Sequence, residues 1–261
     1  MSPKIRWAHA CNSFSELQAA FASGLDAIEA DVCWNEPHGV AVMKHAARSE
    51  ERDLTQECLA TAWIDEALQA DKTKIKILKL DFKSLRAVPN VVDYLASKLT
   101  DQSPEIFLNA DILPGPGAKD GSAAPVDATE FMKYCQKLPH ATLSVGWTTS
   151  YSPLTSLRYE QAHVDQMIKV LEDAAHQRVT FPIRASLAVE SWPALSRLLE
   201  HSSGASLTLW TAHEGVPQHE LDWIVSQVEE HQVYVDCDKG PKEPHYHPVR
   251  IYHSVRWALG W

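Results

Sequence analysis

The residues best suited to chemistry in this sequence are acidic side chains inside short apolar runs. Glu29 and Asp31 lie two positions apart in the run Ala27 to Trp34, and Asp81 lies in the run Ile75 to Lys83. Alternation along a strand places Glu29 and Asp31 on one face. Like charges on a buried face need a cation, and an all-oxygen ligand set suits Mg²⁺ or Ca²⁺. We therefore predict Glu29, Asp31 and Asp81 as ligands of a divalent metal.

Two histidines and two lysines recur at comparable positions. His9 ends the run Ile5 to Ala10, and His45 ends the run Val40 to His45. Histidines with ordinary pKa values of about 6.5 can serve as base and acid on opposite sides of a phosphorus centre. Lys83 shares a strand face with Asp81 and would stabilise charge on phosphate oxygens, and Lys79 lies on the same face. A single strand-end histidine is more often structural, so the prediction rests on the joint occurrence of these residues.

Eight short runs have the composition of strands and alternate with helical patterns. The predicted strands are Ile5 to Ala10, Ala27 to Trp34, Ile75 to Lys83, Glu105 to Asp111, Ala141 to Thr148, Val179 to Ala185, Ser206 to Thr211 and Gln232 to Asp238. The predicted helices are Ser15 to Ser23, Leu54 to Gln69, Val88 to Leu99, Ala128 to Leu138, Tyr159 to Ala175, Trp192 to His201, Gln218 to His231 and Val249 to Leu259. Helix-start signals occur at Ser13, Asp127 and Pro217.

The segment Val40 to His45 follows the second strand after only five residues, which is too short for a crossover helix. It should return as a β-hairpin and bring His45 back to about the height of Asp31. Eight strand–helix units predict an α/β fold, a single (β/α)8 TIM-type barrel with a hairpin after the second strand. An open doubly wound sheet fits the same alternation, but the polar residues at strand ends favour the barrel.

The bulk composition limits the classes of function. With 261 residues and 45% hydrophobic content, the chain is long enough for one barrel, and we expect one domain over residues 1–261. The formal charge of -10 argues against a nucleic-acid surface. The sequence shows neither a transmembrane run nor a signal peptide, and its five scattered cysteines suit a reducing compartment, so we expect a cytoplasmic protein.

Two further residues are candidates for the site. Asn109 and Asp111 end the fourth predicted parallel strand and would extend the polar mouth, although the following Pro114 to Gly117 makes a turn or cap role as plausible. Its residue type alone predicts that Trp210 is an aromatic residue of the barrel rim or core.

Several motifs together resemble the menorin family. They are His9-Ala10-Cys11-Asn12-Ser13, Ile28-Glu29-Ala30-Asp31-Val32, Leu80-Asp81-Phe82-Lys83, Leu108-Asn109-Ala110-Asp111-Ile112-Leu113-Pro114-Gly115-Pro116, Leu143-Ser144-Val145-Gly146-Trp147-Thr148-Thr149 and Phe181-Pro182-Ile183-Arg184-Ala185. More remotely, the first third is similar to glycerophosphodiester phosphodiesterases and spider-venom sphingomyelinase D, members of the PLC-like phosphodiesterase barrels. The order of histidine, Glu-x-Asp pair and second histidine is the same.

This resemblance implies a metal-dependent phosphodiesterase acting on a small or lipid-linked phosphodiester. It implies catalytic roles for His9 and His45 and matches Lys83 to an Asp-x-Lys pattern. Leu209-Trp210-Thr211 resembles a Trp-Thr pair of the phosphodiesterases, which makes Trp210 a substrate-binding candidate beside Lys79 and Asn109. The sequence departs from the phosphodiesterases after each histidine, where Ala10-Cys11 and Ala46 stand.

Two other functions compete with this hypothesis. The departures after the histidines are compatible with a catalytically inactive barrel that serves as a binding or scaffolding protein, because fold alone does not fix function. A metal-dependent lyase or aldolase would instead require Lys79 or Lys83 to form a Schiff base.

Overall fold

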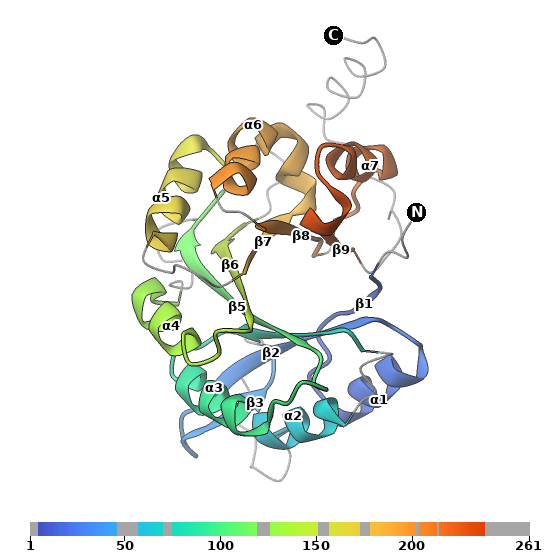
Figure 1. Ribbon diagram of the computed structural model, residues 1–261, viewed down its shortest axis with the longest axis vertical. Helices are drawn as coiled ribbons and strands as arrows, with labels where there is room; N and C mark the ends of the chain where they lie inside the picture. The colour runs from blue at the N-terminus through green and yellow to red at the C-terminus, as the bar shows by residue number, and fades with distance from the viewer. Residues whose placement is uncertain are drawn as a thin grey trace.

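The computed structural model is a nearly closed barrel of parallel strands surrounded by helices (Figure 1). It describes residues 5–45, 57–69, 75–118, 126–150, 157–172, 178–201, 204–212 and 214–237. The predicted helix Val249 to Leu259 lies outside the described residues. In the part of the chain that the structure describes, no helix is long and apolar enough to cross a membrane.

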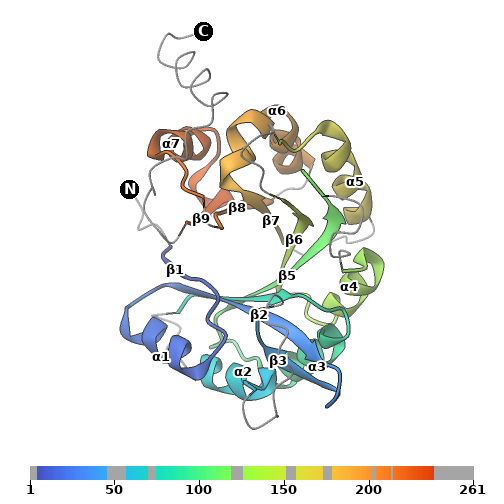
Figure 2. The same ribbon diagram turned by 180° about the vertical axis from the view of Figure 1, so that it is seen from behind.

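The eight parallel strands follow the predicted order and confirm the barrel. They are β1 (Trp7–Ala8), β2 (Ala27–Asn35), β4 (Ile77–Phe82), β5 (Glu105–Pro114), β6 (Thr142–Thr148), β7 (Val179–Arg184), β8 (Ser206–Trp210) and β9 (Val233–Asp236). Each pairs in parallel with the next, from β1 to β9. Strands β1 and β9 end the order and lie beside each other in both views of the ribbon (Figure 2).

The predicted hairpin is also present. Strand β3 (Val40–Met43) runs antiparallel to β2, with Asn35 opposite Val40 and Val32 opposite Met43. Gly39 sits in the turn with a φ of 63°, a left-handed conformation that glycine adopts without a steric penalty. The hairpin extends beyond the carboxyl end of β2, and β3 then brings the chain back to the level of Val32.

Seven helices of the described residues pack around the sheet. They are α1 (Phe14–Ala22), α2 (Ala60–Leu68), α3 (Ala87–Lys98), α4 (Ala128–Cys135), α5 (Gln161–Leu171), α6 (Ala185–His201) and α7 (Gln218–Ser226), and a 3-10 turn, η2 (Glu230–Gln232), precedes β9. Ser13 caps α1 by accepting a hydrogen bond from the Glu16 backbone, and Asp127 caps α4 from Glu130, as predicted.

Several predicted helix boundaries were wrong: helix α2 begins at Ala60 and not at Leu54, α4 ends at Cys135 and not at Leu138, and two further helices differ. Helix α6 begins at Ala185 directly after β7, not at Trp192, and it contains Pro193 in its interior. An interior proline removes a backbone hydrogen bond, yet Ala185 and Ala188 are fully buried, and this packing supports the extra N-terminal turns. Helix α7 ends at Ser226 and not at His231, and His231 lies in a separate 3-10 turn, η2, that begins at Glu230.

The core has two parts. Apolar residues between the strands and the outer helices form the larger part, with Trp63, Phe82 and Phe131 fully buried in it. The smaller part plugs the amino end of the barrel and consists of Trp7, Ala27, Ile77 and Phe107. Above this plug the interior becomes polar, so a site is expected at the carboxyl ends of the strands.

Candidate functional site

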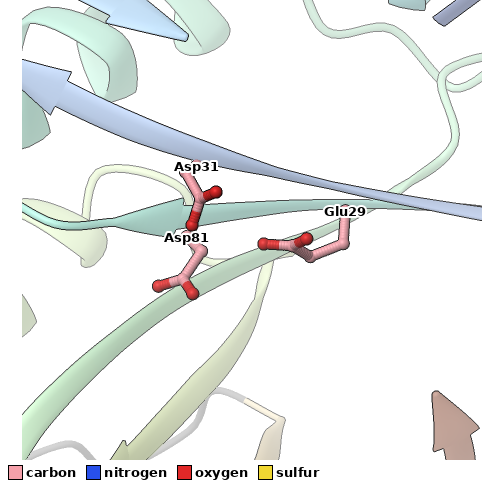
Figure 3. A group of neighbouring side chains, drawn as sticks. All are labelled: Glu29, Asp31 and Asp81. Atoms are coloured by element: carbon pink, nitrogen blue, oxygen red, sulfur yellow. The ribbon is translucent and has the colours of Figure 1, made fainter. Parts of the chain in front are cut away.

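Three carboxylates meet inside the carboxyl end of the barrel. Asp31 on β2 is directly opposite Asp81 on β4, and Glu29 lies two residues earlier on the same face of β2. One oxygen from each lies within 4.8 Å of the others (Figure 3). Glu29 and Asp31 are buried, being 1% and 4% exposed. This hard oxygen donor set fits Mg²⁺ or Ca²⁺, so the residues predicted as metal ligands do come together.

The loop after β1 fixes two of these carboxylates. The Ala10 backbone N–H donates to Glu29 Oε2 at 2.8 Å, and Ala10 itself has a positive φ of 55°. Asn12 donates from Nδ2 to Asp31 Oδ2 at 2.9 Å, while the Asp31 backbone donates to Asn12 Oδ1 at 2.7 Å. These contacts preorganise the carboxylates before any ligand binds.

The electrostatics of the cluster show how strongly its charges interact. Burial, helped by the charges of Asp31 and Asp81, raises the pKa of Glu29 to about 7, although His9 opposes this shift. Burial also opposes ionisation of Asp81, but Lys83 and Lys79 outweigh it and lower the pKa of that carboxyl. Lys83 thus places a positive charge beside both Asp31 and Asp81.

The two lysines lie at different depths. Lys83 Nζ is 3.1 Å from Asp31 Oδ1 and 2.5 Å from Asp81 Oδ2, at the mouth of the barrel. Lys79 is one interior layer deeper, level with Glu29, and only 3% exposed. Its Nζ lies 5.9 Å from the centre of the Trp7 ring, above the apolar plug. Both ammonium groups face the same cavity.

His9 bridges the two ends of the strand order. Its Nδ1 is 3.2 Å from Asp236 Oδ2 on β9 and 3.4 Å from Glu29 Oε2 on β2. Burial lowers the pKa of His9, but Glu29 and Asp236 outweigh it and raise the value to about 9. Asp236 Oδ1 is buried without a hydrogen-bond partner among the described residues. Asp236 therefore orients His9 through Oδ2.

The remaining candidates line the same cavity, which has a volume of about 520 Å³. Its lining residues are His9, Ala10, Asp31, His45, Lys79, Asp81, Lys83, Asn109, Asp111, Pro182, Trp210, Thr211, Ala212, Glu214 and Asp236. His45 reaches it through the hairpin, since the neighbouring Lys44 backbone donates to the Asp31 carbonyl at 3.0 Å. Asn109 is opposite Asp81 in register and accepts a hydrogen bond from Ser144 at 2.5 Å.

The far wall of the cavity holds a buried ion pair that the sequence analysis missed. Arg184 at the end of β7 donates from Nε and Nη2 to the two carboxylate oxygens of Glu214, at 2.5 and 2.8 Å. The Arg184 guanidinium also lies 5.4 Å from the centre of the Trp210 ring. Ser186 adds a third hydrogen bond to Glu214 at 3.1 Å. Arg184 thus packs against the Trp210 ring and is itself fixed by Glu214.

Asp236 could have been recognised by the same strand-end rule that identified Asp81, because it ends the last parallel strand. Arg184 also ends a strand, but Glu214 lies in a loop beyond β8, where spacing along the sequence gave no signal. The pairing of Arg184 with Glu214 depends on the arrangement of β7 and β8 in the barrel.

Comparisons with known proteins identify the family. One solved structure, a 2,3-dimethylmalate lyase of the PEP mutase/isocitrate lyase superfamily, is similar over 98% of this chain and 81% of its own, with 10% identity and a TM-score of 0.45. The chain is 31% identical over 241 residues to Protein FAM151B of Homo sapiens, covering 89% of this chain and 82% of that protein. The model of the menorin N-terminal domain matches residues 2–241. The chain therefore belongs to the menorin family.

Proposed function

We propose that this protein is a metal-dependent phosphodiesterase that cleaves a small or lipid-linked phosphodiester by acid–base catalysis with His9 and His45. One observation carries the proposal: both histidines and both lysines line the same cavity as Asp31 and Asp81, two members of the acidic triad. Separate sites would leave each group with an ordinary structural role. Their convergence supplies acid, base, positive charge and metal ligands around one space.

The metal would be held by Glu29, Asp31 and Asp81, and when bound it supplies a Lewis acid that polarises the phosphoryl oxygens. Lys83 and Lys79 contribute positive charge from the mouth and from the floor of the cavity, and they bind the non-bridging oxygens. Asn109 and Trp210 line the neighbouring walls and contact the rest of the substrate.

The histidines move the protons. One removes a proton from the attacking hydroxyl, and the other donates a proton to the leaving alcohol oxygen as the bond from phosphorus to that oxygen breaks. If a substrate hydroxyl neighbours the phosphate, its attack gives a cyclic phosphate. If water attacks, the product is a phosphomonoester. Asp236 acts as a positioning residue, because it touches His9 and orients the ring toward the cavity.

The test is hydrolysis of bis(p-nitrophenyl) phosphate and of a lysophospholipid panel with Mg²⁺ or Ca²⁺. We expect turnover that requires metal and is lost in His9→Ala and in His45→Ala. His140→Ala is the matched control, because His140 is exposed near the amino end of β6 and lies outside the cavity. Metal binding by calorimetry without turnover on any substrate would reject the proposal and favour a binding or scaffolding protein.

A further inference from the structure

Asp111 is an acidic group of the cavity that the catalytic proposal leaves without a role. It lies near the end of β5, two residues beyond Asn109, and it is opposite Gly146 on β6. Its side chain lines the cavity on the wall between the acidic triad and Pro182 of β7. The position is therefore next to the reacting centre but outside the metal ligands.

Gly146 makes room for this carboxylate. A Cβ atom at position 146 would lie 3.2 Å from Asp111 Oδ1 and 2.7 Å from Pro182 Cγ. The second distance is shorter than a side chain tolerates, and the first is tighter than an ordinary contact. The Asp111 carboxylate thus rests over the bare backbone of β6, and any larger residue at position 146 would displace it.

The other carboxylates that line the cavity or form the triad all have polar partners. The pairs are Glu29 with the Ala10 backbone and His9, Asp31 with Asn12 and Lys83, Asp81 with Lys83, Glu214 with Arg184 and Ser186, and Asp236 with His9. Asp111 differs from them, since within the described ranges its side chain makes neither a hydrogen bond nor an ion pair. Asp111 is half-buried at the cavity wall, so a ligand that enters the cavity with a hydrogen-bond donor can pair with its carboxyl.

The chemistry of that donor follows from the surroundings. Withdrawal from water, together with the charge of Asp81, raises the pKa of Asp111 to about 7, against the opposing effect of Lys83 and Lys79. A hydroxyl group can donate to this carboxyl, and unlike an ammonium group it adds no positive charge to a cavity that Lys79 and Lys83 already line.

We propose that Asp111, seated over Gly146, is a specificity subsite that binds a hydroxyl group on the alcohol portion of the phosphodiester. This inference rests on the proposed function, and it narrows the substrate class to phosphate esters of a hydroxyl-bearing alcohol such as a polyol. Esters of a quaternary ammonium alcohol carry no hydrogen-bond donor at the ammonium group, so Asp111 would form no hydrogen bond with it. A site built around a hydrogen bond discriminates against the analogue that lacks it.

The experiment measures binding of three phosphomonoesters to the Mg²⁺-loaded full chain by calorimetry: glycerol 3-phosphate, phosphocholine and phosphoethanolamine. We expect glycerol 3-phosphate to bind roughly 10- to 100-fold more tightly than phosphocholine, the range of a hydrogen bond to a charged group. Asp111→Ala should abolish this preference, and Gly146→Ala should weaken it. Asp93→Ala, which removes an exposed aspartate on α3, should leave it unchanged.

Three results would overturn the inference: equal binding of glycerol 3-phosphate and phosphocholine by the wild type, a preference that survives in Asp111→Ala, or no binding of any of the three esters. Tighter binding of phosphoethanolamine than of glycerol 3-phosphate would replace the hydroxyl with an ammonium group and also overturn it. Hydrolysis assays on the same variants separate the two proposals. A preference that depends on Asp111 without turnover rejects only the phosphodiesterase, and turnover without that preference rejects only the subsite.

Discussion

The two sides of the barrel differ in how their buried charged groups are paired. On the side of β1 to β5, three carboxylates converge within 4.8 Å, and Lys83 forms ion pairs with two of them, Asp31 and Asp81. On β7, β8 and the loop beyond β8, polar groups pair with one another: Arg184 forms two hydrogen bonds with Glu214, and the hydroxyls of Thr180 and Thr208 are 2.9 Å apart. The first side therefore gathers like charges at one point, and the second side pairs opposite charges one to one.

The difference follows from what each group costs when it is buried. Like charges that are held together raise the free energy of the folded state unless a cation joins them. A bidentate arginine–carboxylate pair, by contrast, offsets much of its own desolvation. The acidic side should therefore respond strongly to metal, whereas the paired side should determine stability and leave metal binding unchanged.

The largest expected effect is on metal affinity. The Glu29→Ala, Asp31→Ala double variant should lose at least about 100-fold in Mg²⁺ or Ca²⁺ affinity by calorimetry, because it removes two of three ligands. Glu229→Ala, Glu230→Ala is the matched control, since it removes two exposed carboxylates and changes the net charge equally. Unchanged Mg²⁺ affinity in the first variant would show that the metal site is misassigned.

On the paired side, Arg184→Met should cost about 3–5 kcal/mol in the free energy of unfolding, because Glu214 would stay buried without its partner. Urea denaturation measures this cost. The Arg184→Met, Glu214→Leu double variant should recover most of it, and Mg²⁺ affinity should change in neither variant. A stable Arg184→Met protein would mean that Glu214 rotates into the solvent.

The same contrast explains which parts of the structure could be predicted from the sequence. Alternation places Glu29 and Asp31 on one face, and adjacent parallel strands bring Asp81 level with Asp31, so the triad follows from local patterns. Partners such as Arg184 with Glu214 belong to β7 and a loop beyond β8, and only the closed barrel decides that they meet. The start of α6 was missed for a related reason, since buried packing overrides the proline signal there.

A pH titration of stability sharpens the comparison further. Burial opposes ionisation of Glu214, but the hydrogen bonds and charge of Arg184 outweigh it and lower the pKa of the carboxyl below its ordinary value of 4.5. A lowered folded pKa stabilises the protein above that ordinary value, and the stabilisation is lost as the pH falls through the folded pKa. The stability difference between wild type and Arg184→Met, Glu214→Leu should therefore move in favour of the variant below about pH 4.5. A difference that stays constant from pH 7 to pH 3 would contradict the pairing.

The smallest expected effect concerns the hydroxyl pair on the paired side. Thr180 and Thr208 lie on neighbouring strands and are completely buried, and each hydroxyl has the other as its partner. Replacing one threonine by valine leaves the other hydroxyl unsatisfied, at a cost of about 1–3 kcal/mol in the free energy of unfolding. Replacing both removes donor and acceptor together, so Thr180→Val, Thr208→Val should be nearly as stable as wild type. Additive losses in this double-mutant cycle would show that each hydroxyl has a separate partner, and β7 and β8 would then not be paired through these hydroxyls.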